Sequence, residues 1–339
     1  MPVTIYDVAR QAGVSTATVS KVLSNTPYVS DSTRAKVLAA VSDLDFIPSL
    51  AARGLSQSRT HIIGLAFPYA SDYLFDDPHL MLFLRGVENI ATMHDHSILL
   101  MTARQSDDAA GGLRRLLHTH YVDGAIVVGM ESVRPVTAEL RHRAYPTVAL
   151  GYFSPLGDQN TVHADDYQGA RLAVAHLLAL GHRRIGLIGG PPEITAVGQR
   201  IQGFTDALSD YGLSFSQALM AAGDFTQESG FAAAVHLLAQ PERPTAVFSV
   251  NDRMALGFMA YAQAIGLAIP ADLSIVGFDD IPSAAYSHPA LTTVHQPSLD
   301  LGRTAAERLL QLIEHGAESF APLVLPTTFV LRGSTRPVA

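Results

Sequence analysis

The sequence predicts an α plus α/β protein, in which a small helical domain is followed by a larger body of alternating strands and helices. Two short helical patterns, separated by a glycine, occupy the first 25 residues. From residue 61 onward, short apolar runs alternate with helix-length amphipathic segments. The length of 339 residues is also too great for one ordinary hydrophobic core.

Residues 4–25 have the pattern of two short helices around a tight turn. Thr4 can cap the first helix, and Asp7, three residues later, completes a capping box. Gly13 follows the last apolar position, where a left-handed residue is favoured, and Ser15 can cap the second helix. The turn and the two caps together predict a helix-turn-helix.

The second helix of this pair has an apolar face and a polar face. Small or polar residues and one lysine occupy the side away from the apolar face: Thr16, Ala17, Ser20 and Lys21. Such a face suits the floor of a DNA major groove, which admits an α-helix. An amphipathic helix pair also occurs in helical bundles, but the agreement of turn, caps and N-terminal position favours a DNA-reading helix.

Composition and charge are compatible with a DNA-binding protein of the cytoplasm. The net charge is −8, but residues 1–60 carry six Lys or Arg against four Asp, a net +2, so the remainder carries −10. A mildly basic head on an acidic body would orient the head toward DNA. The chain has no cysteine, no apolar run of membrane-spanning length and no signal-peptide pattern. We therefore expect a cytoplasmic, nucleoid-associated protein.

A third helix and a linker are expected between the helix pair and the body. Ser30 can cap a helix whose apolar pattern, which includes Leu38, continues to Asp45, so a three-helix domain spans residues 1–47. Pro48 breaks the chain, and the rest of residues 48–60 can form only a short helix. A helix this short is marginal in isolation and should need a binding partner to become ordered.

The body, residues 61–339, should contain two lobes. Its βα repetition predicts parallel sheets covered by helices, and its length exceeds that of one doubly wound sheet. We assign residues of about 61–158 and 293–320 to the first lobe, and about 161–290 and 322–335 to the second. A ligand would lie between the lobes, at the carboxyl ends of the strands.

Five motifs in order resemble the lactose-repressor/galactose-repressor family of bacterial transcription regulators. They are TIYDVARQAGVSTATVSKVLSN, PSLAARGL, LLALGHRRIGLIGG, VNDRMALG and IVGFDDIPSAAYSHPALTTVHQP, and they cover essentially the whole chain. The resemblance implies a helix-turn-helix head with a hinge helix and a periplasmic-binding-protein-like body. It also implies a homodimer on a palindromic operator, with a small-molecule effector in the cleft between the lobes.

The resemblance assigns DNA contacts to the head and the hinge. In the head they are Thr4, Tyr6, Ser15, Thr16, Ala17, Ser20, Lys21 and Asn25. Thr16 and Ala17 can touch a thymine methyl group, and Lys21 can donate to guanine. In the hinge the positions are Ala52, Arg53 and Leu55, and Leu55 matches a leucine that family members wedge into the minor groove.

The resemblance also assigns effector contacts in the second lobe. Arg200 lies where family members grip effector oxygens, and Asp279 matches their ligand-binding aspartate. Phe225 can stack on a ligand ring, and Asn251 offers both donors and an acceptor. A structural ion pair between Arg200 and Asp279 remains an alternative.

The first lobe is less clear from its sequence. The candidates are residues of an aromatic and acidic loop, for which a plain surface position is the alternative: Tyr69, Tyr73, Phe75 and Asp76. Gly151 stands where some sugar-binding members carry a polar contact. The paired histidines at positions 94/96 and 118/120 would diverge on a helix, so no metal site and no cofactor are expected.

These features predict a ligand-gated transcription regulator, specifically a repressor of carbohydrate-metabolism genes with a sugar effector. A purine or another metabolite is the alternative effector, since Phe225 could stack on a base. A sugar-binding module without gating is a more remote alternative. No GxGxxG, Walker lysine or Ser-His-Asp signature is evident, so we do not expect an enzyme.

Overall fold

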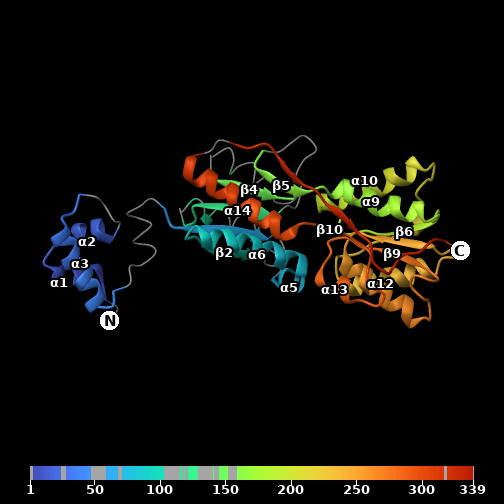
Figure 1. Cartoon of the computed structure of the whole chain (residues 1–339), viewed down its shortest axis with the longest axis horizontal. Helices are drawn as coiled ribbons and strands as arrows, with labels where there is room; N and C mark the ends of the chain where they lie inside the picture. The colour runs from blue at the N-terminus through green and yellow to red at the C-terminus, as the bar shows by residue number, and fades with distance from the viewer. Residues whose placement is uncertain are drawn as a thin grey trace.

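The computed structural model describes the three-helix head and most of the two-lobed body. The described residues are 3–23, 28–46, 59–67, 71–102, 115–116, 118, 121–128, 140, 145–151, 159–316 and 319–338. Figure 1 shows the head helices at one end of the molecule and the second lobe, with the C-terminus, at the other. Among the described residues, no helix combines the length and the apolar character needed to cross a bilayer.

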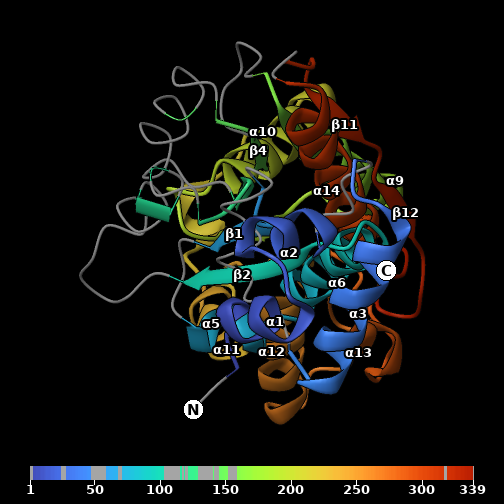
Figure 2. The same cartoon turned by 90° about the vertical axis from the view of Figure 1, so that its left-hand side faces the viewer.

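The head consists of α1 (Ile5–Ala12), α2 (Thr16–Leu23) and α3 (Asp31–Asp43). Its predicted caps are confirmed. The Asp7 carboxylate accepts hydrogen bonds from the backbone N–H of Thr4 at 3.0 Å and from its hydroxyl at 2.6 Å. Gly13 ends α1 with a φ of 68°, and the Ser15 hydroxyl accepts the backbone N–H of Thr18 at the start of α2. Figure 2 shows the three helices from the side facing away from the body.

The head core follows the apolar stripes of its helices. Its fully enclosed members come from all three helices: Val8, Ala9, Val19, Val22, Val37 and Ala40. Leu38 is an exception, because its side chain is 50% exposed although the sequence analysis included it in the apolar pattern. The neighbouring Val37 takes the inward position, and adjacent residues on a helix point about 100° apart.

The first lobe contains a six-stranded parallel sheet in the order β11-β5-β4-β3-β1-β2. In that order the strands are Leu323–Leu325, Thr161–Ala164, Thr147–Leu150, Gly124–Val128, Ile62–Phe67 and Ser97–Thr102. The described helices of this lobe are α5 (Ser71–Asp76), α6 (Pro78–Met93) and α14 (Ser298–His315). In Figure 1, α14 lies beside α6 against the sheet.

The second lobe contains a four-stranded parallel sheet in the order β7-β6-β8-β9 and a separate antiparallel pair, β10 and β12. The sheet strands are Met220–Ala221, Ile185–Ile188, Ala246–Ser249 and Ser274–Val276, and the pair comprises Thr293–His295 and Thr328–Val330. The helices are α9 (Asp166–Ala179), α10 (Thr195–Asp210), α11 (Gln227–Leu238), α12 (Asp252–Ala264) and α13 (Pro282–Tyr286), with a short 3-10 helix η2 (Gln217–Leu219).

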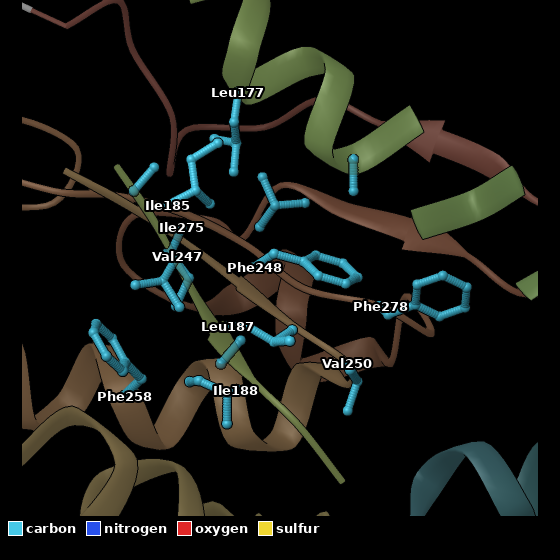
Figure 3. Packing of buried hydrophobic residues seen from close by; sticks show 14 of the residues in the cluster. Leu177, Ile185, Leu187, Ile188, Val247, Phe248, Val250, Phe258, Ile275 and Phe278 are labelled. Atoms are coloured by element: carbon cyan, nitrogen blue, oxygen red, sulfur yellow. The ribbon is translucent and has the colours of Figure 1, made fainter. Parts of the chain in front are cut away.

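The core of the second lobe lies on both faces of its sheet. Figure 3 shows strand residues such as Val247 and Phe248 between Leu177 of α9 on one side and Phe258 of α12 on the other. The helix pairs approach closely at glycines. A Cβ atom on Gly257 of α12 would lie 1.9 Å from the carbonyl oxygen of Gln227 at the start of α11. Only a residue without a side chain allows this separation of the two backbones.

The chain passes between the lobes three times, and this changes the lobe boundaries expected from the sequence. Residues 161–164, which the sequence pattern places in the second lobe, form β5 and pair with β4 in the first sheet. Residues 323–325 form β11, which pairs with β5 in that same sheet. Residues 293–295 form β10, which pairs with β12 beside the second lobe and not with the first. Strands of three or four residues carry too little pattern to indicate which sheet they join.

Candidate functional site

A cavity of about 110 Å³ lies between the two lobes. It opens at the carboxyl ends of strands from both sheets, where side chains of successive loops converge. The first-lobe wall consists of Asp77, His79, Leu80, Phe83, Val128, Leu150, Gly151, His163, Ala164 and Leu301. The opposite wall consists of Asp166, Ile194, Ala196, Val197, Arg200, Phe225, Asn251, Asp279 and Gln296.

Arg200 of α10 is the central polar residue of this cavity. Its Nε donates to Asp166 Oδ1 at 2.8 Å, and its Nη2 donates to Gln296 Oε1 at 2.6 Å. Its Nη1 donates to Asp279 Oδ1 at 3.1 Å and to the carbonyl oxygen of Val250. A guanidinium has five N–H donors, so these four hydrogen bonds leave one Nη2 N–H for another acceptor.

Buried carboxylates outnumber the guanidinium in the cavity wall. Asp77 comes from the first lobe, and Asp166 and Asp279 come from the second. Burial raises the pKa of Asp279 from 3.8 to about 6, although Arg200 and His79 favour its charged form. The carboxylates of Asp77 and Asp166 act in the same direction as burial. The cavity is therefore rich in hydrogen-bond acceptors and unfavourable for an anion.

Two loop residues that line the cavity from the second lobe have a positive φ, a backbone conformation that residues other than glycine seldom adopt. Phe225 has a φ of 70° and Asp279 a φ of 105°. Such residues persist only where surrounding contacts hold them, and they are concentrated at functional sites. The Asn251 side chain caps α12 by accepting the backbone N–H of Met254 at 2.9 Å, and it donates to the Phe225 carbonyl oxygen at 3.1 Å. Asn251 thus ties the Phe225 loop to the start of α12.

Asp252 fixes the loop that carries Asp279. Its Oδ1 accepts the hydroxyl of Thr293 at 2.6 Å, and its Oδ2 accepts the backbone N–H of Ile281 at 2.9 Å. Burial, assisted by the charge of Asp279, raises the pKa of Asp252 well above its usual value. The loop after β9 is therefore held to β10 and α12 by one buried side chain, which was not among the residues chosen from the sequence.

The structure brings together all four residues that the sequence analysis chose in the second lobe. Arg200, Phe225, Asn251 and Asp279 line the same cavity. The structural alternative for Arg200 and Asp279 is also realised, because the two side chains form an ion pair at 3.1 Å inside the cavity wall. Lining the cavity and pairing with each other are therefore compatible.

The described first-lobe candidates do not line the cavity. Phe75 is 56% exposed and Asp76 is also exposed, and neither lines the cavity. Tyr69 and the side chain of Tyr73 lie outside the described residues. The cavity is instead lined by Asp77 and His79, which begin α6.

A sequence signal for these two residues was present. Asp77 is the N-cap of α6, its Oδ1 accepts the backbone N–H of His79 at 2.9 Å, and Pro78 occupies the first helical position. An Asp-Pro pair before an apolar helical run is a helix-start signal. The first turn of that helix faces the cavity, whereas α5 before it carries Phe75 outward.

The head presents the residues predicted to face DNA. Thr4, Tyr6, Ser15, Ala17 and Lys21 are exposed, and Tyr6 is 69% exposed although it is large and aromatic. Thr16 and Ser20 are half-buried on the same helix, α2. The remaining predicted DNA contacts lie outside the described residues: Asn25, Ala52, Arg53 and Leu55.

Comparison with known proteins gives matches along the whole chain. The family model described as bacterial regulatory proteins, lacI family, matches residues 4–49, and the periplasmic binding protein-like domain matches residues 174–335. The transcriptional repressor PurR of Proteus mirabilis is 36% identical over 98% of this chain and 96% of its own length.

Solved structures are similar over the same extent. The lac repressor dimer bound to operator and the anti-inducer ONPF is 31% identical, with a TM-score of 0.87 over 99% of this chain and 100% of that one. The transcriptional regulator CelR in complex with cellobiose is 31% identical, with a TM-score of 0.75 over 98% of this chain and 99% of that one. The chain therefore belongs to the lacI family of bacterial regulatory proteins, and it is a ligand-responsive transcription repressor with a DNA-binding head.

Proposed function

We propose that this protein represses carbohydrate-metabolism genes by binding a palindromic operator as a homodimer, under the control of a neutral sugar in the interlobe cavity. The observation that carries the effector proposal is the donor and acceptor balance of the cavity wall. Arg200 has already engaged four of its N–H groups, and three buried carboxylates line the same cavity. A ligand that offers many hydroxyl donors and no negative charge matches this wall.

A structural neighbour supports a sugar as the effector. The CelR neighbour was solved as a complex with cellobiose. A purine is the second candidate here, because the Phe225 ring lines the cavity and could stack on a base. Each ligand class predicts a different response to loss of that ring, as described below.

Arg200 also offers a route from ligand to lobe geometry. Asp166 follows the first passage between the lobes, and Gln296 lies in the second, between β10 and α14. The guanidinium donates to both of them. A ligand that binds Arg200 therefore acts where the lobes are joined, and it can favour one lobe arrangement if its affinity differs between the two.

The homodimer is supported by exposed apolar side chains on the second lobe. Phe231 and Val235, four residues apart on α11, are 44% and 43% exposed. The Phe231 ring packs edge-on against Tyr261 of α12 at a centroid separation of 4.9 Å. An isologous contact would cover this patch on both subunits at once. Two heads held at a fixed spacing could then read both halves of a palindrome in the bacterial cytoplasm.

Operator selection and ligand screening on the full-length chain test the proposal. Palindromic duplexes selected from a random pool should bind more tightly than scrambled duplexes, and sedimentation should show a dimer. Neutral sugars should raise the melting temperature, by an amount equivalent to about 2.7 kcal/mol at a hundredfold excess over Kd. Their 6-phosphates should not.

A matched variant separates the two ligand classes. Phe225→Leu should weaken a purine more than a sugar, because only the planar base gains from stacking on the ring. Absence of any preferred palindrome would refute the DNA function. Stabilisation by sugar phosphates in place of sugars would refute the effector class.

A further inference from the structure

Two histidines lie side by side at the edge of the first-lobe sheet that is remote from the cavity. His61 directly precedes β1 and His96 directly precedes β2, and these parallel strands are paired from Ile62 with Ser97 onward. The cavity lies at the carboxyl ends of the strands, so the histidines occupy the opposite, amino ends. Their ring centroids are 5.0 Å apart, and the ring planes are inclined by 42°.

One ring nitrogen of each histidine is buried and has no hydrogen-bond partner among the described residues: Nδ1 of His61 and Nε2 of His96. The other nitrogen of His96, Nδ1, lies 2.7 Å from the carbonyl oxygen of His94. A carbonyl oxygen only accepts, so Nδ1 carries the proton, and in the neutral ring Nε2 holds a lone pair. Buried polar atoms in folded proteins nearly always have a partner, so unpaired nitrogens on two neighbouring rings suggest a ligand that both rings could share.

The arrangement has the features of an imidazole pair that ligates one cation. Imidazoles that bind a metal usually donate their second N–H to a carbonyl or carboxylate, as His96 does. With Zn–N distances of about 2.0–2.1 Å and tetrahedral angles, two imidazole centroids on one ion lie about 5 Å apart. The observed separation of 5.0 Å matches this value.

We propose that His61 and His96 bind a divalent transition-metal ion of the Zn²⁺, Co²⁺ and Ni²⁺ class. The described residues contain no group of three or more His, Cys, Asp or Glu side chains that could hold a metal ion. With these two protein ligands among the described residues, water would complete the coordination sphere, and the ion would exchange with solvent. The ligands are neutral imidazole nitrogens, a type that suits these borderline metals and not Mg²⁺ or Ca²⁺.

The site would act on the point where the linker reaches the body. The Asp123 carboxylate accepts the backbone N–H groups of Thr60 and His61 at 2.6 and 2.7 Å, so this entry point is already fastened to the strand β3 region. An ion shared by His61 and His96 adds a second attachment, to the turn between α6 and β2. It would stiffen the segment that follows the hinge.

Cobalt titration of the full-length, tag-free chain tests the site directly. The protein, stripped of metal by chelation, should bind one Co²⁺ per chain with saturating visible absorption, and Zn²⁺ should displace it. His61→Gln and His96→Gln should each weaken binding about tenfold or more. The matched control is His94→Gln. The His94 side chain is exposed, and His94 contacts the histidine pair only through its backbone carbonyl oxygen.

Two outcomes would overturn the proposal. One is non-saturating Co²⁺ binding by the wild-type chain, which would mean that the two nitrogens bind water and not a metal ion. The other is equal affinity in the wild-type chain and both glutamine variants, with circular dichroism showing intact folds. Operator and sugar binding are measured separately on the same proteins. The metal site can therefore be refuted while the repressor function is supported, and the repressor function can be refuted while the metal site is supported.

Discussion

Replacing Asp279 by Asn should make the stability of the body less sensitive to pH. The asparagine side chain resembles a protonated carboxyl group in shape and charge, so the variant serves as a reference without ionisation. In the wild-type chain the folded pKa is about 6, against 3.8 for the ordinary carboxyl group. Ionisation of Asp279 is therefore harder in the folded protein than in the unfolded chain, and it opposes folding.

The sign and size of the effect follow from these two pKa values. Below pH 3.8 the group is protonated in both states and has no effect. As pH rises through the window from 3.8 to 6, the unfolded chain loses the proton first, so the folded state becomes relatively less stable. Above pH 6 the full penalty applies, about 3 kcal/mol at 1.36 kcal/mol per pKa unit. Between pH 5 and pH 7.5 the increment is about 1 kcal/mol.

Urea denaturation followed by far-UV circular dichroism measures this increment. The free energy of unfolding of Asp279→Asn minus that of the wild type should grow by about 1 kcal/mol from pH 5 to pH 7.5. Asp76→Asn, which removes one exposed negative charge from the first lobe, is the matched control. A difference for Asp279→Asn that stays constant over this range would refute the argument that burial controls this carboxyl group.

Four further substitutions test the helix contacts and the DNA-reading helix. Gly257→Ala should destabilise the second lobe by about 1–3 kcal/mol in urea denaturation, because the new Cβ meets a carbonyl oxygen. The control, Gly198→Ala, should stabilise α10 by up to about 1 kcal/mol, because no neighbouring group lies within 4 Å of the new Cβ. Ser15→Ala should lower the free energy of unfolding of the head by about 1 kcal/mol through loss of the α2 cap, as its thermal melt would report. Lys21→Gln should weaken binding to the selected operator by about 1–3 kcal/mol in fluorescence anisotropy, with the change concentrated at one base pair of each half-site.

Local features of the head could be predicted from the sequence because short-range geometry determines them. The capping box of Thr4 and Asp7, the left-handed Gly13 and the Ser15 cap each depend on residues within a few positions of each other. Leu38 shows where this reasoning stops. Its spacing fits an apolar stripe, but three helices enclose only one side of α3, and Val37 occupies that side.

The candidate site could be predicted only in part, for reasons that lie in tertiary structure. In the second lobe, Arg200 lies in the second turn of α10 and Asp279 in the loop after β9, so the resemblance of their surrounding sequence to the family allowed their convergence on the cavity to be anticipated. In the first lobe, aromatic character drew attention to Phe75, yet the direction of two consecutive helices decides which residue faces inward. The helix-start signal at Asp77 and Pro78 indicated where the second of these helices begins, but the aromatic residues before it were more conspicuous.

The threefold passage of the chain between the lobes has a consequence for how the body can be dissected. The first sheet takes β11 from the C-terminal part of the chain and is packed against α14, while β12, only a few residues after β11, belongs beside the second lobe. Neither half is therefore encoded by an uninterrupted stretch of the gene. A fragment that stops near residue 290 would lack the helix and the edge strand that complete the first half, so useful deletion products are limited to removal of the head.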